Sequence, residues 1–204
     1  QKISKSLGNV IKPHDLVERY GLDQTRYFLL REVPFGNDGD FSRESMVTRM
    51  NSELANDYGN LAQRALSMIA KNLKGIAPEP GAFTDDDQAM LNAAGELPAV
   101  LRPLMDAQAF HEALERIWVI IRAANVYVDR QAPWVLRKTD APRMGTVLYV
   151  LAETIRRLAI MTQPFMPDAS AKMLDAVASP ADKRNFGDVI DTAAMLAPGA
   201  ELPK

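Results

Sequence analysis

From about residue 42 onward, apolar positions recur every three or four residues, which is the spacing of amphipathic helices. The pattern predicts a helix that starts at Ser42 and continues until Gly75, with a break near Asn51. Thr84 is expected to start another helix, which should kink or end at Pro98 or Pro103. Further helices are expected over residues 107–130, 142–162 and 168–177. About five helices in sequence predict a helical bundle over residues 42–178.

The first 41 residues mix two kinds of pattern and predict a small α/β region. Val10 and Ile11 predict a short strand, which is followed by a short helix over residues 13–20 that Gly21 terminates. Asp23 is expected to cap a second helix over residues 24–33, and the glycine-containing stretch 34–42 predicts a loop. Residues 179–204 predict a tail packed on the surface. The fold class is therefore mainly α, with parts at residues 1–41, 42–178 and 179–204.

Composition narrows the class of protein. The chain of 204 residues is 47% hydrophobic and 25% charged, which is typical of a soluble protein with a substantial core. It has no cysteine and two histidines, so we expect no metal site. No apolar run is long enough to cross a bilayer and no signal peptide is evident, so we expect a cytoplasmic protein, without a membrane partner and monomeric by default.

Charge is unevenly distributed along the chain. The net charge of −2 argues against indiscriminate binding to nucleic acid, which usually needs a strongly basic surface. However, residues 1–31 carry six lysines and arginines against three acids, and residues 122–144 carry five against two. Two basic segments in an otherwise acidic chain could bind a polyanion in one orientation. Clusters of like charge are, however, more often simply solvent-exposed surface.

Residues 2–6 have the sequence KISKS and are followed by LGNVI. Lysine ammonium groups and serine hydroxyls on a short loop suit phosphate oxygens, with a solvated basic terminus as the alternative. The stretch resembles the KMSKS signature loop of class I aminoacyl-tRNA synthetases. The resemblance implies ATP as cofactor, with Lys5 and Lys2 stabilising charge on the triphosphate, and Ser4 and Ser6 shaping the loop or contacting phosphates. Any Mg²⁺ would be bound mainly by a catalytic half that this sequence lacks.

Three side chains in the predicted bundle are candidates for contact with nucleic acid. Asn60 and Arg64 lie four residues apart, on one helix face, and offer an amide and a guanidinium that can bind base edges. Trp134 follows Pro133 at the end of a predicted helix, where its face can stack on an unstacked base. From the residues alone, an asparagine such as Asn60 is more often a solvated helix residue, and an arginine such as Arg64 more often an ordinary ion-pair partner. Trp134 could lie in the core, as we expect for Trp118.

Residues 34–42, 42–64 and 128–138 resemble the methionyl-tRNA synthetases. The resemblance implies that Asn60, Arg64 and Trp134 recognise the CAU anticodon of methionine tRNA, and that Asp129 helps to discriminate among its bases. The whole enzyme would be an ATP-dependent methionine-tRNA ligase that forms methionyl adenylate and then transfers methionine to the tRNA. The nucleotide-binding half of that family is not in the sequence, so we expect this chain alone to bind tRNA weakly and to be inactive.

Two alternatives to this interpretation stay open. Another class I synthetase, of the leucine, isoleucine, valine or cysteine type, would share the signature loop but should lack the combination of Asn60, Arg64 and Trp134. A stand-alone helical module that binds RNA or protein would not need the KISKS stretch. The pair Arg156 and Arg157 is expected on the surface rather than in any binding site.

Overall fold

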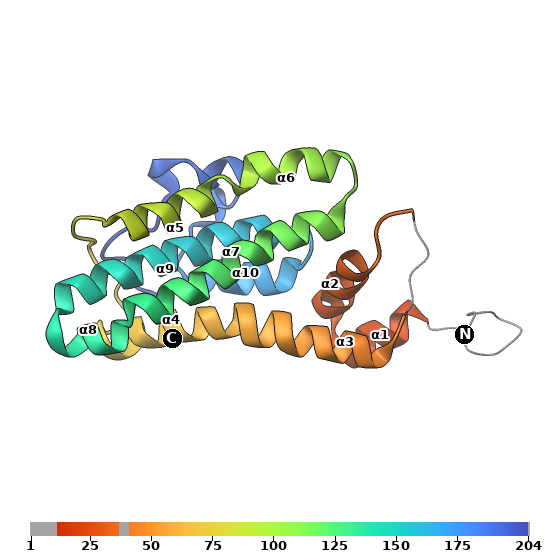
Figure 1. The fold of residues 1–204 in the computed structure, drawn as a ribbon, viewed down its shortest axis with the longest axis horizontal. Coiled ribbons are helices and arrows are strands. Elements are labelled where there is room, and N and C mark those ends of the chain that lie inside the picture. The colour runs from red at the N-terminus through yellow and green to blue at the C-terminus, as the bar shows by residue number, and fades with distance from the viewer. Residues whose placement is uncertain (1–11, 37–40, 204) are drawn as a thin grey trace, which may run out of the picture.

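The computed structural model describes residues 12–36 and 41–203, which form a bundle of helices with a smaller helical region at one end (Figure 1). Within these ranges the only extended pairing is an isolated bridge between Ile76 and Glu201. The expectation of a mainly α fold with a helical bundle is confirmed. The predicted strand at Val10 and Ile11 lies outside the described residues.

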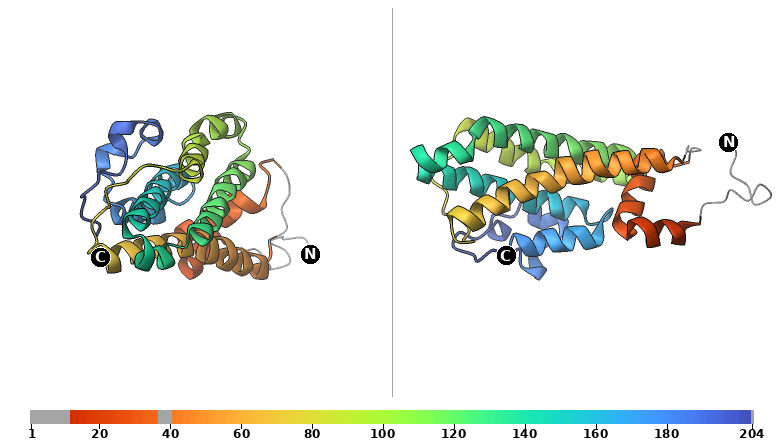
Figure 2. Two further views of the ribbon diagram at one scale, coloured as in Figure 1. Left: turned by 60° about the vertical axis from the view of Figure 1, so that its left-hand side comes forward. Right: turned by 90° about the horizontal axis from the view of Figure 1, so that it is seen from below.

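The bundle is built around one central helix. Helix α9 is buried along almost its whole length and packs against α4, α5, α7, α8 and α10, as the two further views also show (Figure 2). The helices of the bundle are α3 (Arg43–Arg49), a π-helix η2 (Met50–Gly59), α4 (Asn60–Asn72), α5 (Asp85–Gly95), α6 (Leu97–Asp106), α7 (Phe110–Gln131), α8 (Pro133–Thr139), α9 (Ala141–Thr162) and α10 (Pro167–Ala176). An amphipathic helix buries one stripe, whereas α9 is covered on all sides and therefore forms the core itself.

The helix predicted from Ser42 is continuous over residues 43–72. Its start is as predicted, because the Ser42 hydroxyl accepts a hydrogen bond from the Ser45 amide at 3.3 Å. The predicted break near Asn51 is wrong. The chain instead changes from α-helical to the wider π-helical turn at Met50 and returns to α at Asn60 without interruption.

The helix predicted from Thr84 also begins as expected. Thr84 and Asp87 form a capping box, in which each side chain accepts a hydrogen bond from the other residue's amide. The helix ends at Gly95, and Pro98 lies in the first turn of α6, where a missing amide hydrogen costs nothing. Pro103 lies inside α6.

The smaller region consists, in its described part, of α1 (Pro13–Tyr20) and α2 (Leu22–Glu32). Gly21 separates them with a φ of 95°, a conformation that suits glycine. The prediction that Asp23 caps α2 is wrong: Gly21 occupies the cap position. The Asp23 carboxylate is buried and accepts a hydrogen bond from the Ala169 amide at 2.5 Å, which ties α2 to α10.

Charged groups join α2 to the bundle as well. Glu53 of the π-helix accepts a hydrogen bond from the Tyr27 hydroxyl and forms ion pairs with Arg31 and Arg49. Burial, together with the hydrogen bond to Glu53, raises the pKa of Tyr27 far above its ordinary value. The hydroxyl therefore remains a donor at all relevant pH values and fixes α2 against η2.

The core confirms one expectation about single residues and contradicts another. Trp118 is fully buried, as predicted, and its indole nitrogen donates to the Glu53 carbonyl at 3.4 Å. The expectation that Arg156 and Arg157 form a surface pair is wrong. Both are buried, because Glu153 lies one turn earlier on α9 and pairs with both guanidinium groups.

The tail covers one side of the bundle with three short 3₁₀ turns, η3 (Ala181–Lys183), η4 (Phe186–Val189) and η5 (Thr192–Ala194). The Tyr149 hydroxyl of α9 donates to the Leu196 carbonyl at 3.0 Å and holds the tail in place. Among the described helices, none combines the length and the apolar character that a membrane crossing requires.

Candidate nucleic-acid interface

The four predicted residues of the bundle come from three helices that meet at one end of the molecule. Asn60 is the first residue of α4, and Arg64 follows one turn later on the same face. Asp129 lies near the end of α7, and Trp134 lies in the first turn of α8. Asn60, Asp129 and Trp134 are exposed and Arg64 is half-buried.

The turn between α7 and α8 decides where Trp134 lies. Ala132 adopts the left-handed conformation, with φ 44° and ψ 58°, and its amide donates to the Val128 carbonyl to close α7. Pro133 then starts α8, because its fixed φ suits the first turn of a helix. The chain changes direction at this one residue, and the indole ring of Trp134 lies against Arg64 of α4.

Three of the predicted residues are in direct contact. Nη2 of Arg64 donates to Oδ1 of Asp129 at 2.5 Å, which is a charge-assisted hydrogen bond. The guanidinium carbon of Arg64 lies 5.3 Å from the centre of the Trp134 ring, within the range of a cation–π contact. Arg64 is therefore held between a carboxylate and an aromatic face, and both contacts restrict its orientation.

An apolar recess of about 330 Å³ lies beside this group. Arg64 and Trp134 contribute to its wall. The other lining residues are apolar and come from α4, α7, α9 and the start of α8: Ala65, Met68, Val128, Pro133, Leu148 and Leu151. Trp134 keeps 42% of its surface exposed, so this ring is not a core residue like Trp118. An aromatic ring with one supported side and one open side is suited to stacking on a planar ligand.

Two exposed basic residues beside Trp134 were not singled out from the sequence. Arg137 and Lys138 lie one turn further along α8, so they project from the same region as Trp134. Nη1 of Arg137 is 3.5 Å from Oδ1 of Asn72, at the end of α4. Their three- and four-residue spacing from Trp134 was the signal that could have identified them. They give the site a positive rim that complements phosphate groups.

The predicted ATP-binding residues, Lys2, Ser4, Lys5 and Ser6, lie outside the described residues. In the part of the chain that the structure does describe, no group of three or more histidine, aspartate and glutamate side chains is arranged to hold a metal ion.

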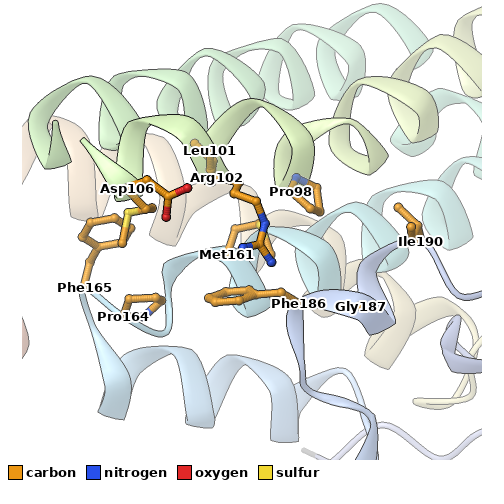
Figure 3. Close-up of a pocket in the computed structure, with 11 residues that line it drawn as sticks. Pro98, Leu101, Arg102, Asp106, Met161, Pro164, Phe165, Phe186, Gly187 and Ile190 are labelled. Carbon is orange, nitrogen blue, oxygen red and sulfur yellow. The ribbon is translucent and has the colours of Figure 1, made fainter. Parts of the chain in front are cut away.

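A second pocket, also of about 330 Å³, lies between α6, the end of α9 and η4, and none of Asn60, Arg64, Asp129 and Trp134 lines it (Figure 3). Its wall is mostly apolar, and the Arg102 side chain extends across it toward the ring of Phe186. Phe165 and Phe186 line this pocket, but no Asn or Gln side chain does, whereas Asn60 lies one turn from Arg64 at the interface. The interface on α4, α7 and α8 is therefore the stronger candidate site.

Comparison with known proteins agrees with this geometry. Residues 1–66 match the family model described as tRNA synthetases class I (M), and residues 77–203 match the anticodon binding domain of methionyl tRNA ligase. The fold and the matched regions thus identify the chain as part of the class I aminoacyl-tRNA synthetase family, with a helical domain of the anticodon-binding type. The second match covers more than half of the sequence, and the chain belongs to the methionyl-tRNA synthetase family.

Individual relatives span the whole chain. It is 58% identical over 203 residues to the methionine–tRNA ligase of Brucella melitensis biotype 1, and 49% identical over 207 residues to that of Mycobacterium leprae. All of this chain is covered in both comparisons, but only 39% and 38% of the relatives. The structure of Mycobacterium tuberculosis methionyl-tRNA synthetase in complex with methionyl-adenylate matches with a TM-score of 0.94 and 50% identity, covering 99% of this chain and 40% of that one. The chain therefore spans about two fifths of the length of these relatives.

Proposed function

We propose that this chain recognises the CAU anticodon of methionine tRNA, as part of an ATP-dependent methionine-tRNA ligase. The observation that supports this most strongly is the arrangement of Arg64 between Asp129 and the open ring of Trp134. Such a group can bind an unstacked base on its face and its edge together. The family match of residues 77–203 to an anticodon-binding domain supports the same function.

Each residue of the group has a distinct role in the proposal. Trp134 stacks on the first anticodon base, since Arg64 lies against its ring and much of the indole is still exposed. Arg64 donates to acceptors on base edges, and Asp129 fixes the direction of the guanidinium by accepting one of its five N–H groups. Asn60 offers an amide that both donates and accepts, one turn away from Arg64 on the same face.

Phosphate contacts supply affinity rather than selectivity in this proposal. Arg137 and Lys138 are exposed beside Trp134 and would neutralise phosphates of the loop. Binding should therefore weaken as salt increases. The choice of CAU over other anticodons would depend on Asn60, Arg64, Asp129 and Trp134, because only base contacts distinguish sequences.

In the whole ligase, residues 2–6 would contribute to methionyl-adenylate formation. By their resemblance to the signature loop, Lys5 and Lys2 would stabilise the negative charge that develops on the triphosphate of ATP, while Ser4 and Ser6 would shape the loop or contact phosphates. The match of residues 1–66 to the class I family supports this assignment. Domain limits of 1–41, 42–178 and 179–204 remain part of the proposal.

The proposal is tested by titrating the chain into a labelled RNA hairpin with a CAU loop, followed by fluorescence anisotropy at low salt. A hairpin with one anticodon base changed should bind more weakly. The Trp134→Ala variant should lose about 1 to 3 kcal/mol of binding free energy, which is the usual contribution of one stacked base. Phe186→Ala is the matched control, because it removes a similarly exposed aromatic ring from a distant part of the molecule.

Equal binding of the two hairpins by a folded protein would contradict the proposal. So would unchanged binding by Trp134→Ala, or an equal loss in Phe186→Ala. Circular dichroism of each variant establishes that a loss of binding does not arise from unfolding.

A further inference from the structure

The long helix formed by α3, η2 and α4 carries a row of exposed polar side chains at intervals of four residues. The row begins at Thr48 and ends at the proposed anticodon site; its members, here called the polar strip, are Thr48, Ser52, Asn56, Asn60 and Arg64. The first four are exposed and Arg64 is partly exposed. The strip is therefore accessible over four helical turns and is continuous with the residues proposed to bind the loop.

The π-helical segment keeps these positions on one side of the helix. In an α-helix of 3.6 residues per turn, positions four apart drift by about 40° at each step, or about 160° between residues 48 and 64. The π-helix has i to i+5 hydrogen bonds and a wider turn, which drifts in the opposite direction. Because Met50–Gly59 is π-helical, the two drifts partly cancel and the strip stays narrow.

The part of the strip before Arg64 is uncharged. The Ser52 hydroxyl donates to the Thr48 carbonyl at 2.9 Å, so its oxygen is left as an acceptor. Within the residues that the structure describes, the side chains of Thr48 and Asn56 have no hydrogen bond to another residue, so both can donate and accept. This part of the helix thus offers neutral donors and acceptors.

The charged side chains next to the polar strip do not favour the binding of phosphate. The guanidinium of Arg49 lines a recess with Thr48 and Ser52, and it is already paired with Glu32 and Glu53, at 2.7 and 3.0 Å. This polar recess of about 460 Å³ is lined by two carboxylates, Glu32 and Glu44, and by Arg49, whose charge is already paired; the other lining residues are Ser45, Thr48 and Ser52. Carboxylates at this position would repel a phosphate, so any nucleic acid that lies here must present a neutral group.

We propose that the polar strip binds ribose 2′-hydroxyls in the stem of the RNA whose loop is bound at Trp134. This inference rests on the proposed function. The 2′-hydroxyl is a neutral donor and acceptor, it lines the wide minor groove of an RNA helix, and it is absent from DNA. Four helical turns correspond to roughly 20 Å at about 1.5 Å per residue, which is long enough to follow a stem away from its loop. The strip would therefore select RNA over DNA and would do so without charge.

The test compares the wild-type chain with the Ser52→Ala/Asn56→Ala double variant. Alanine is the best helix former, so the double variant should keep the helix. Two hydrogen bonds are lost, and binding of the all-ribose CAU hairpin should weaken about tenfold. The slope of log affinity against log salt concentration should not change, because neutral side chains displace no counterions. Asn92→Ala, on an exposed position of α5 across the bundle, is the matched control and should bind like wild type.

A second hairpin has the same loop but 2′-deoxyribose in the stem, so that two proteins are compared on two hairpins. Wild type should bind the deoxyribose-stem hairpin about as weakly as the double variant binds the all-ribose hairpin. The double variant should bind the two hairpins with nearly the same affinity. Two single variants, both with Asn56 unchanged, separate the hydroxyl from other effects of substitution. Ser52→Thr keeps the hydroxyl and should bind the all-ribose hairpin more tightly than Ser52→Ala does. Equal affinity of wild type for ribose and deoxyribose stems would overturn the inference, as would a change in salt slope.

The inference and the proposed function fail in different ways. If CAU is preferred and Trp134→Ala abolishes the preference, but the double variant binds normally, only the polar strip is refuted. If neither hairpin is bound, or if both loops bind equally, the proposed function fails and the inference fails with it. In the outcome that we expect, the double variant binds the all-ribose hairpins more weakly than wild type does but keeps its preference for CAU.

Discussion

Glu153 gathers two arginines inside the bundle. Its carboxylate is fully buried and accepts hydrogen bonds from Nε and Nη2 of Arg156, both at 2.8 Å, and from Nε of Arg157 at 2.7 Å. It also accepts from the Leu196 amide at 2.9 Å. The arginines in turn donate to carbonyl groups of other segments: Arg157 to Leu91 on α5, and Arg156 to Asp188 in the tail. One carboxylate thus joins α9, α5 and the tail.

We predict that Glu153→Gln lowers the free energy of unfolding by about 3 to 5 kcal/mol. The neutral side chain has nearly the same shape, but it leaves two buried guanidinium groups without a counter-charge, and removal of one partner from a buried ion pair typically costs this much. One amide N–H would also face a guanidinium donor. Equilibrium unfolding in urea, followed by circular dichroism, gives the free energy.

The control is Asp175→Asn, which breaks the exposed pair between Asp175 and Arg184, at 2.7 Å in the structure. An exposed pair contributes less than about 1 kcal/mol, so this variant should be nearly as stable as wild type. A loss of less than about 1 kcal/mol in Glu153→Gln would refute the reasoning, because the cluster would then behave like a surface pair.

A double-mutant cycle provides a second test of the same reasoning. Arg157→Gln combined with Glu153→Gln leaves only one uncompensated charge, so the double variant should lose less stability than the sum of the two single variants. The coupling should fall within about 0.5 to 3 kcal/mol, as for residues in one ionic network. Strict additivity would show that the charges do not interact.

Two further predictions concern stability. Burial raises the pKa of Asp87, but hydrogen bonds from Arg143, Tyr127 and Thr84 outweigh it and lower that pKa to about 2. The stability that the lowered pKa provides is present above about pH 4 and is lost as pH falls toward 2. Between pH 6 and pH 3, the free energy of unfolding in urea should therefore fall by about 1 kcal/mol more for wild type than for Asp87→Asn. Equal decreases in the two proteins would contradict this. Ala132→Gly should stabilise the protein by about 0.5 to 1 kcal/mol by relieving the left-handed φ of 44°, and a destabilised variant would show that the turn carries no strain.

Local chemistry in the sequence was sufficient to predict much of the bundle. Ser42 and Thr84 start helices because their hydroxyls can accept from amides three residues ahead, and both do so in the structure. Gly21 ends α1 because it tolerates a positive φ. Trp118 is buried because its neighbours on the helix are apolar. In each case the determining partners lie within a few residues.

The errors arise where tertiary packing decides the outcome. Asp23 looks like a helix cap, but its carboxylate is bound by Ala169, which is 146 residues away. Arg156 and Arg157 look like a surface pair because two adjacent charges usually are one, but α9 is surrounded on all sides and Glu153 neutralises them. Tertiary packing overrides the local preference, because the sequence pattern shows neither that Ala169 binds Asp23 nor that α9 is covered on all sides.

The candidate site was predictable residue by residue, but its geometry was not. The resemblance named Asn60, Arg64, Asp129 and Trp134, yet no spacing along the chain indicates that Arg64 is held between Asp129 and Trp134. That contact depends on the single left-handed residue Ala132, since a continuous helix through it would carry Trp134 further along α7 and away from α4.

The π-helix shows how one local feature serves two faces of the same helix. Its buried or half-buried side repeats every four residues through Met46, Met50, Leu54 and Tyr58, and the polar strip repeats at the same interval on the exposed side. An α-helix would rotate both series steadily around its axis, so that by the last turn the core residues would leave the core and Arg64 would leave the site. The wider π-helical turn keeps the buried series facing the core and the polar strip on the exposed side. The four-residue repeat of apolar positions from Met46 to Tyr58 is therefore the sequence signal of the widened segment.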